Sequence, residues 1–231
     1  MRLLAISAST EYCSAALKIG THLLERELAP ERAAAERILE LVDWLLAEAG
    51  IGLGSLDAIA FGRGPGAFTG VRLAASVTQG LAMSAALPVL AVSDLQAVAQ
   101  AVANRAEHSG RVLICQDARM QEVYWGWFEI LAAVAQPRSG ERVSPPATLL
   151  ALCAAEELGD SAGAGSGFAA YPQLQALFRA APERLWPQLY PRAREIAQLA
   201  AHQGLAAAVS AEQAQPVYVR DQVASVPGAL T

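Results

Sequence analysis

Residues 61–72 read Phe61-Gly62-Arg63-Gly64-Pro65-Gly66-Ala67-Phe68-Thr69-Gly70-Val71-Arg72. This glycine-rich loop lies between an apolar run and a long stretch without charge. Glycine reaches positive φ and leaves backbone N–H groups accessible, and the dipole of a following helix favours an anion at its start. The loop therefore has two interpretations. Either it binds a ligand through Gly64, Gly66, Thr69 and Gly70, or it is a tight strand-to-helix turn with Thr69 as the N-cap.

Neither common phosphate-binding signature fits this loop. A P-loop has a lysine directly after its last glycine, where this chain has Val71. The dinucleotide fingerprint needs a different glycine spacing and follows the first strand of its fold. Local chemistry therefore favours the tight turn, while the ligand-binding interpretation stays open.

The composition indicates a globular protein without a broad basic surface. The chain has 231 residues, of which 54% are hydrophobic, enough for one large core or two smaller ones. Its formal net charge is −5 and Lys18 is its one lysine, so we expect any role with RNA to depend on a partner. Cys13, Cys115 and Cys153 are far apart and odd in number, which fits neither a zinc site nor a disulfide framework, and each is expected to be buried.

We expect a cytoplasmic protein that does not cross a membrane. Met1-Arg2 leads directly into a strand-like run, without the basic and apolar regions of a signal peptide. Leu73 to Ser93 carries no charge and is long enough to span a bilayer. Polar residues interrupt this stretch, however, and Pro88 divides a helical part from a strand-like part, so we reject a membrane span.

Hydrophobic periodicity predicts an α/β lobe over residues 1–107. Strands are expected at Leu3–Ser7, Ser14–Ile19, Leu23–Leu28, Leu56–Phe61 and Val89–Val92. Helices are expected at Ala33–Ala49, at Gly70–Leu87, and from a capping box of Ser93 and Gln96 to about Glu107. Three meander strands followed by alternating helices and strands is the order of a ribonuclease-H-like lobe, the half-unit of the actin-like ATPases. This analogy concerns the fold alone.

Residues 108–231 are predicted to form a second, partly degenerate lobe of the same kind. Val112–Gln116 and Val123–Phe128 repeat the strand-turn-strand opening, although the repeat is weak. Further helices are expected at Thr148–Leu158 and at Arg192–Gln203, with Gly204 as the stop, and a glycine-rich turn at residues 163–167. The tail at residues 216–224 is expected to be extended.

The helix that follows the glycine loop has no charged face. A helix without charge on any side must be buried on more than one side. The sheet covers one side, and either the preceding amphipathic helix or a second protein covers the other. Small residues along the helix permit close approach, which favours a helical partner: Ala74, Ala75, Ser76, Gly80, Ala82, Ser84 and Ala85.

No catalytic constellation is visible in the sequence. His22, His108 and His202 form no metal-binding pair, and no nucleophile signature surrounds a serine or cysteine. Actin-like ATPases carry an acidic residue at the end of the first strand, where this chain has Ser7. Asp117 stands at the parallel point of the second lobe, where a turn-forming role is favoured over a metal contact.

The glycine loop combines with other segments into a recognisable set: Leu4-Ala5-Ile6, Ser9-Thr10-Glu11, Asp117-Ala118-Arg119-Met120, Glu122-Val123-Tyr124-Trp125 and Pro216-Val217-Tyr218-Val219-Arg220. Together they resemble the bacterial TsaB proteins, also called YeaZ, from the first strand to the tail. The resemblance implies a two-lobed actin-like fold and a role in making threonylcarbamoyladenosine in tRNAs that read codons beginning with adenine.

In that family TsaB is an accessory subunit. The resemblance implies a heterodimer with the paralogue TsaD, which holds the metal and transfers the threonylcarbamoyl group. The TsaE ATPase joins this complex, and TsaC or a relative makes the activated carbamoyl adenylate from threonine, bicarbonate and ATP. The chain alone is then expected to bind no cofactor or metal, while the complex uses ATP and meets the tRNA.

The family's two first-lobe helices pack against those of TsaD in a bundle, and the same face can form homodimers. Carried onto this chain, the helices are Ala33–Ala49 and Gly70–Leu87. The predicted partner contacts are Ile38, Leu41, Val42, Leu45, Ala74, Val77, Thr78 and Leu81.

This chain departs from the family pattern at two places. Ser7-Ala8 stands where Asp-Thr usually ends the first strand, which weakens any claim to nucleotide binding by this chain alone. Ala34-Ala35 stands where relatives often carry His-Ser. The leading hypothesis is a non-catalytic scaffold for a TsaD-like transferase. The alternatives are a self-contained actin-like ATPase or kinase, and a metallopeptidase, since relatives have been labelled glycoproteases.

Overall fold

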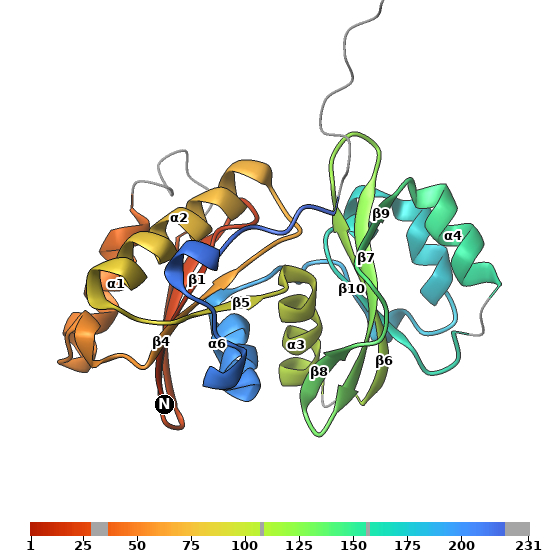
Figure 1. Ribbon diagram of the computed structural model, residues 1–231. Coiled ribbons are helices and arrows are strands. Elements are labelled where there is room, and N and C mark those ends of the chain that lie inside the picture. The colour runs from red at the N-terminus through yellow and green to blue at the C-terminus, as the bar shows by residue number, and fades with distance from the viewer. Residues whose placement is uncertain (29–36, 107–108, 156–157, 220–231) are drawn as a thin grey trace, which may run out of the picture.

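The computed structural model describes residues 1–28, 37–106, 109–155 and 158–219, which form two lobes with one sheet each (Figure 1). The first sheet has the order β3-β2-β1-β4-β5. Its strands are β1 (Arg2–Ser7), β2 (Cys13–Ile19), β3 (His22–Leu28), β4 (Ala58–Gly62) and β5 (Val89–Val92). The first three strands are antiparallel, whereas β1, β4 and β5 are parallel. This is the ribonuclease-H-like order predicted from the sequence.

The second sheet repeats that arrangement, with the order β11-β10-β6-β7-β8. Its strands are β6 (Gly110–Asp117), β7 (Val123–Leu131), β8 (Val134–Pro137), β10 (Ala162–Ala164) and β11 (Leu185–Trp186), and β9 (Arg142–Ser144) pairs with β7. Strands β6 to β8 are antiparallel, and β6, β10 and β11 are parallel. The predicted α/β fold of two actin-like lobes is confirmed, and the repeat is more complete than the sequence indicated.

Helices cover both faces of the first sheet because its strands are apolar on both sides. Leu4 and Ile6 of β1 face α1 (Ile38–Ala49) and α2 (Phe68–Ala85). Leu3 and Ala5, which point the other way, pack on α6 (Ala193–Gln203). Runs of this kind are typical of strands that are buried on both faces.

The third helix of each half of the chain packs on the sheet of the other half. Helix α3 (Asp94–Ala106) follows β5 but packs on the second sheet, where Val98 and Val102 contact a core built on β6 and β7. Helix α6 follows β11 but packs on β1, β2 and β4. The two helices also contact each other, between the lobes in Figure 1. The predicted boundary near residue 107 therefore separates the two sheets, but it does not separate their cores.

The outer face of the second sheet is covered by α4 (Pro146–Ala154) and α5 (Gly167–Ala170) (Figure 1). Their core contains Leu113, Trp125, Leu149 and Phe168. The predicted helix over Thr148–Leu158 is thus shorter than expected, since α4 ends at Ala154 and residues 156–157 lie outside the described part of the chain.

The other element predictions differ from the structure mainly at their ends. Helix α1 begins at Ile38, and most of the predicted start of that helix, Ala34-Ala35 included, lies outside the described residues. Strand β4 begins at Ala58 because residues 53–55 form a short 3-10 turn. The predicted extended tail is described only to residue 219, where it has no regular structure.

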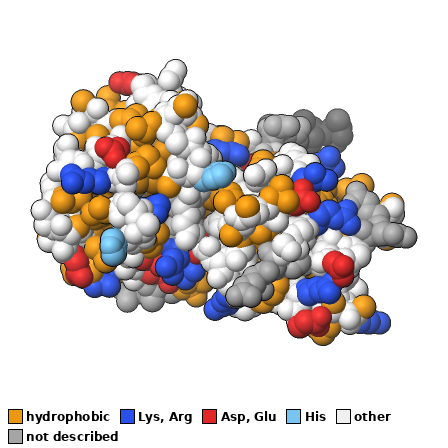
Figure 2. Space-filling view, turned by 90° about the horizontal axis from the view of Figure 1, so that it is seen from below, with side chains coloured by type: hydrophobic (Ala, Val, Ile, Leu, Met, Phe, Trp, Pro, Cys, Tyr) orange, Lys and Arg blue, Asp and Glu red, His pale blue; other side chains and the backbone are white. Residues whose placement is uncertain are grey.

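No helix in the described part of the chain is long and apolar enough to cross a membrane. Helix α2 ends at Ala85, before Pro88. Acidic and basic side chains are interspersed over the face seen in Figure 2, without a patch of one sign.

Candidate functional site

The glycine loop packs directly on the residues that follow β1. A Cβ at Gly70 would overlap the carbonyl group of Ala8, lying 2.9 Å from its carbon, and a Cβ at Gly66 would lie 2.6 Å from the Ser9 oxygen. Real Cβ atoms do not approach other atoms so closely, and these neighbours are backbone atoms that cannot swing away. Gly64 has a φ of 98°, in the region that favours glycine. The glycines are thus explained by close packing of backbone on backbone.

Backbone N–H groups of the loop are bonded within the protein. Gly64 N donates to Asp94 Oδ2 at 2.6 Å, Ala67 N to the Ser9 oxygen at 2.7 Å, and Arg63 N to the Val92 oxygen at 2.8 Å. The prediction of Thr69 as N-cap is wrong. The N-cap is Ala67, which makes no side-chain cap bond, and Thr69 lies inside the first turn of α2. The start of α2 is held by the close packing of Gly66 and Ala67 on the backbone of Ser9 and not by a side-chain cap.

Asp94 is a buried carboxylate that the sequence did not single out. Besides Gly64 N, it accepts a hydrogen bond from Ser9 Oγ at 2.6 Å, so it joins the start of α3 to the glycine loop and to the residues that follow β1. Burial raises the pKa of Asp94 from 3.8 to about 6, although both hydrogen bonds act in the opposite direction. Its neighbour Ser93 accepts the predicted N-cap bond from Gln96 N at 3.0 Å, but the Gln96 amide donates to the Ala135 oxygen instead of completing a capping box.

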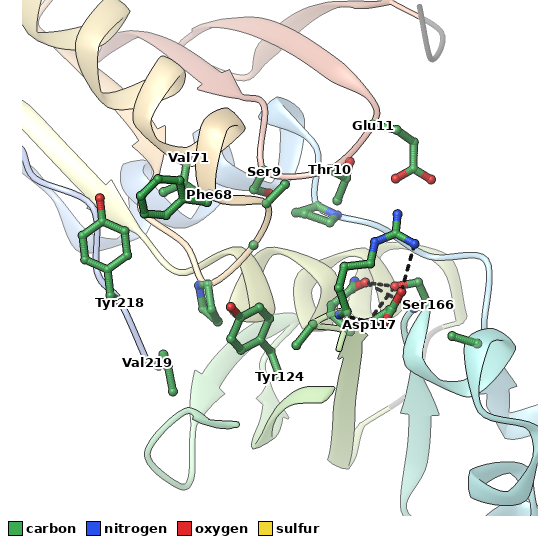
Figure 3. Close-up of a pocket in the computed structure, with 18 of the residues that line it drawn as sticks. Ser9, Thr10, Glu11, Phe68, Val71, Asp117, Tyr124, Ser166, Tyr218 and Val219 are labelled. Carbon is green, nitrogen blue, oxygen red and sulfur yellow. Dashed lines mark hydrogen bonds and ion pairs between the residues drawn. The ribbon is translucent and has the colours of Figure 1, made fainter. Parts of the chain in front are cut away.

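A cavity of about 800 Å³ opens between the two lobes beside the glycine loop (Figure 3). The first lobe contributes residues 9–11 and 65–68, and the second lobe contributes residues 116–119, Tyr124 and Ser166. Residues 217–219 close a third side. Of the weak ligand-binding candidates, only Gly66 lines this cavity, while Gly64, Thr69 and Gly70 do not.

The aromatic side chains of the cavity lie toward one side in Figure 3, with Phe68 and Tyr218 next to each other. Their ring centroids are 5.8 Å apart. The guanidinium of Arg72 lies 3.6 Å from the centroid of Phe68, and Arg72 Nε donates to the Tyr218 hydroxyl at 2.8 Å. The backbone N–H of Val217 donates to the Arg63 oxygen at 2.8 Å, which holds this part of the tail against the glycine loop.

Asp117 lies on the opposite side of the cavity, at the end of β6 (Figure 3). Its Oδ1 accepts hydrogen bonds from Arg119 N at 2.9 Å and from the Tyr171 hydroxyl at 3.3 Å, and its Oδ2 lies 3.3 Å from Arg119 Nη1. These bonds agree with the predicted turn-forming role. The neighbouring Ser166 Oγ donates to Gln116 Oε1 at 2.5 Å and accepts from Asp117 N at 3.1 Å.

Most of the predicted partner contacts lie in the protein's own core, which corrects the prediction for those residues. On α1 the four predicted residues are all buried against the first sheet: Ile38, Leu41, Val42 and Leu45. On α2, Ala74 and Thr78 are also buried, and only Val77 and Leu81 are half-buried. The apolar stripe of an amphipathic helix faces the sheet, so the stripe identified the core.

The outer face of α2 is formed by other residues of the same helix. Its exposed residues are Phe68, Thr69, Arg72, Ser76, Gly80, Met83 and Ser84. The opposite flank is covered by the 3-10 turn at Ala211–Gln213. Ala211 and Ala214 belong to the core under α2, and Gln79 Nε2 donates to the Ala214 oxygen at 3.0 Å. A partner helix is therefore not needed to bury that flank.

Two comparisons with known proteins decide the family of this chain. A family model described as TsaD, tRNA N6-adenosine threonylcarbamoyltransferase, matches residues 27–227. The tRNA threonylcarbamoyladenosine biosynthesis protein TsaB of Escherichia coli (strain K12) is 37% identical over 233 residues, which cover 99% of both chains. The chain belongs to the TsaB family. Its members are named as tRNA threonylcarbamoyladenosine biosynthesis proteins, and the predicted family is confirmed.

Other relatives agree with the TsaB assignment. The TsaB of Haemophilus influenzae is 49% identical over 128 residues, which span 54% of this chain and 52% of that protein. The solved structure of YeaZ from Pseudomonas aeruginosa matches with a TM-score of 0.82 and 40% identity, and covers 94% of this chain and 99% of that one. A second Pseudomonas aeruginosa structure, titled as similar to peptidase YeaZ, has a TM-score of 0.83 and 42% identity.

The residues that could bind a metal or act as nucleophiles are scattered or buried in the described part of the chain. Across residues 1–28, 37–106, 109–155 and 158–219, no three His, Cys, Asp or Glu side chains are placed to hold a metal ion. Ser7 at the end of β1 is buried, and its Oγ donates to the Pro191 oxygen at 3.3 Å. The three cysteines are buried and free, as predicted: Cys13, Cys115 and Cys153.

Proposed function

We propose that this TsaB-family chain is a non-catalytic accessory subunit, which binds and activates a TsaD-like transferase in the complex that forms N6-threonylcarbamoyladenosine in tRNA. The single observation that carries the proposal is the outer face of α2. Beyond its first turns this face carries mostly small side chains, and Arg72 is the one charged residue of the 18-residue helix.

The shape of that face suits a helical partner. Ser76, Gly80 and Ser84 are spaced four residues apart, so they lie in one row along the helix. Because small side chains let two backbones approach closely, a partner helix can pack along the row. Met83, of which 59% is exposed, lies beside it and offers an adaptable apolar contact. The family's known paralogue with equivalent helices makes a TsaD-like subunit the partner that we propose.

Helix α1 contributes an edge to the same surface. Helices α1 and α2 lie side by side on one face of the first sheet (Figure 1). Leu39 of α1 is 49% exposed, and Glu40 and Asp43 are exposed beside it. We therefore place the interface on Leu39 and the outer face of α2, while Val77 and Leu81 remain flanking contacts. The same surface can pair two copies of the chain in the absence of the partner.

The catalytic steps are assigned to the other subunits. In this proposal the TsaD-like subunit holds the metal, a TsaE-like ATPase joins the complex, and a TsaC-like enzyme supplies the activated intermediate. The chain meets tRNA through the complex, in the cytoplasm, and binds no cofactor by itself. The internal hydrogen bonds of Gly64 and Ala67 support this last point, since they remove N–H groups from a phosphate site.

Isothermal titration calorimetry with the purified TsaD-like subunit tests the interface. Met83→Glu places a charge on the outer face of α2. Leu152→Glu is the control, because it places the same charge on α4 of the other lobe, where Leu152 is 43% exposed. We expect Met83→Glu to weaken binding at least tenfold and Leu152→Glu to leave it unchanged. Equal affinities of the two variants would remove α2 from the interface.

The rival function is that of a self-contained actin-like ATPase or kinase. The cavity between the lobes and Asp117 at its edge are the observations in its favour. Calorimetry with Mg-ATP and a turnover assay on the chain alone separate the two functions. Tight binding with turnover would favour the rival, and no turnover agrees with the accessory role. Elemental analysis for stoichiometric zinc tests the metallopeptidase hypothesis in the same way.

A further inference from the structure

The row of small residues on the outer face of α2 continues toward the start of the helix with two large ones. Arg72 stands four residues before Ser76, and Phe68 stands four residues before Arg72, so both lie in the same row. Both are exposed, and Phe68 keeps 46% of its surface in solvent. A partner that packs along the row therefore meets these two side chains at one end of the contact.

The guanidinium of Arg72 is held in place by two aromatic rings. It lies 3.6 Å from the centroid of the Phe68 ring, and its Nε donates to the Tyr218 hydroxyl at 2.8 Å. Phe68 and Tyr218 lie next to each other in Figure 3. The hydrogen bond from Val217 N to the Arg63 oxygen keeps this part of the tail against the glycine loop. Because the long side chain of Arg72 is already ordered, a group that binds it loses less conformational entropy on association.

The charge of Arg72 is uncompensated. Helix α2 has no acidic residue in its first turn, and Arg72 lies one turn from the positive end of the helix dipole. Among the residues that the structure describes, no carboxylate lies within ion-pair distance of its guanidinium. The bond to Tyr218 uses Nε alone, so both Nη groups remain as donors. This end of α2 is therefore prepared for an anion.

The composition of the site favours a protein carboxylate over an RNA backbone. Sites for nucleic acids gather several cations, because each contact neutralises one phosphate. Arg63 of the glycine loop already lies 3.2 Å from Glu141, and Arg119 lies 3.3 Å from Asp117. One guanidinium beside exposed aromatic rings is instead typical of the residues that dominate protein interfaces. A guanidinium also binds a carboxylate through two parallel hydrogen bonds.

We propose that Arg72 is the polar anchor of the interface on α2, and that the partner helix places an aspartate or glutamate on it. Phe68 and Tyr218 border this ion pair and exclude water from it, which strengthens the attraction. A helix with an apolar or basic residue at this place would leave the guanidinium unpaired, so Arg72 selects among helical partners. The inference rests on the proposed function, because it names the chemistry of the partner at the same surface.

Calorimetry with the purified TsaD-like subunit, at about 50 mM and about 500 mM NaCl, tests the anchor. We expect Arg72→Gln to weaken binding about tenfold or more, since truncation of a central interface residue has that effect. The higher salt should weaken binding of the wild type several-fold and affect Arg72→Gln much less. Arg179→Gln is the matched control, because Arg179 is an exposed arginine of the second lobe, and it should bind as the wild type does.

A scan of the partner identifies the carboxylate directly. The acidic residues of the TsaD-like subunit are replaced by alanine one at a time and combined with Arg72→Gln. We expect one replacement whose loss of affinity is not additive with that of Arg72→Gln, as is found for residues in contact. Additive losses for every acidic residue would overturn the ion pair.

Two further results would overturn the inference. In the first, Arg72→Gln binds as the wild type does while Met83→Glu loses affinity, so that the interface on α2 stands without the anchor. If Met83→Glu also bound normally, the proposed interface would fail together with the anchor. In the second, Arg72→Gln lowers the affinity of the isolated chain for tRNA and leaves the affinity for the TsaD-like subunit unchanged, which assigns the cluster to RNA.

Thermal unfolding shows whether each variant is folded. If Arg72→Gln is unfolded, Arg72→Lys replaces it, because lysine keeps the charge without the planar pair of donors. We then expect Arg72→Lys to bind more weakly than the wild type and to keep the salt dependence. A wild-type affinity that does not change with salt would contradict the anchor without any variant.

Discussion

Two glycines in α2 give a matched test of why the glycine loop has its sequence. Gly80 lies in the interior of the helix, and a Cβ there would meet nothing within 4 Å. Gly70 lies in the first turn of the same helix, where a Cβ would overlap the carbonyl group of Ala8. Both positions have ordinary negative φ, so substitution by alanine changes packing and helix propensity without a left-handed penalty.

The two substitutions should therefore act in opposite directions. Gly80→Ala should stabilise the chain by up to ~1 kcal/mol, the difference in helix propensity, which raises Tm by about 2–4 °C for a protein of this size. Gly70→Ala must displace backbone atoms of a buried loop, which costs about 1–3 kcal/mol or more for overpacking and exceeds the smaller gain in propensity. We expect Tm to fall by at least about 4 °C.

Thermal unfolding followed by circular dichroism checks both variants of the isolated chain. If Gly70→Ala unfolded at or above the wild-type temperature, close packing on Ala8 would not be the reason for this glycine. The ligand-binding interpretation of the loop would then regain support.

Three further predictions concern buried polar groups. Burial raises the pKa of Asp94 from 3.8 to about 6, so the folded chain holds this proton more tightly than the unfolded chain does. The stability that the protonated carboxyl contributes is complete below pH 4 and is lost as the pH rises past 6, on the order of 3 kcal/mol. In urea unfolding, the free energy of unfolding of Asp94→Asn should rise relative to that of the wild type by about that amount between pH 4 and pH 7. A difference that stays constant over this range would contradict the raised pKa of Asp94. Glu195 is fully buried and bonded to Arg192 at 3.0 Å, so Arg192→Ala should destabilise the chain by about 3 kcal/mol, and a loss below about 1 kcal/mol would show that the pair is replaceable. Burial raises the pKa of Cys13 to about 11, and all three thiols should resist a thiol reagent until urea unfolds the chain. Rapid reaction of a thiol in the native protein would contradict their burial.

The sequence predicted the elements better than it predicted what they contact. Strand β5 was placed at Val89–Val92, as observed, because a short apolar run between turn residues has few alternatives. The resemblance to the family predicts a partner contact for Leu41 and Leu45 of α1, whereas the structure buries both against the sheet, as expected for the apolar stripe of an amphipathic helix. The exposed side of α2 is the side opposite its own buried residues, such as Ala74 and Thr78, and the sequence pattern could have located it in this way.

The crossing of α3 and α6 and the role of Asp94 were not predictable in the same way. Which sheet a helix covers depends on the path of the chain between the lobes, and local periodicity carries no information on it. Asp94 stands at the start of a helix, where an acidic residue is common for electrostatic reasons alone. Only the approach of Ser9 and Gly64 distinguishes it, and both are far away in the sequence.

Reconstitution of the tRNA modification tests the central claim most directly. The TsaD-like, TsaE-like and TsaC-like proteins are combined with tRNA, threonine, bicarbonate and ATP, and the modified nucleoside is measured by mass spectrometry. We expect little product without this chain, full product with it, and reduced product with Met83→Glu that recovers at high concentrations of the variant. Product formed by this chain in the absence of the TsaD-like subunit, or full product at low concentrations of a variant that no longer binds it, would contradict the accessory role.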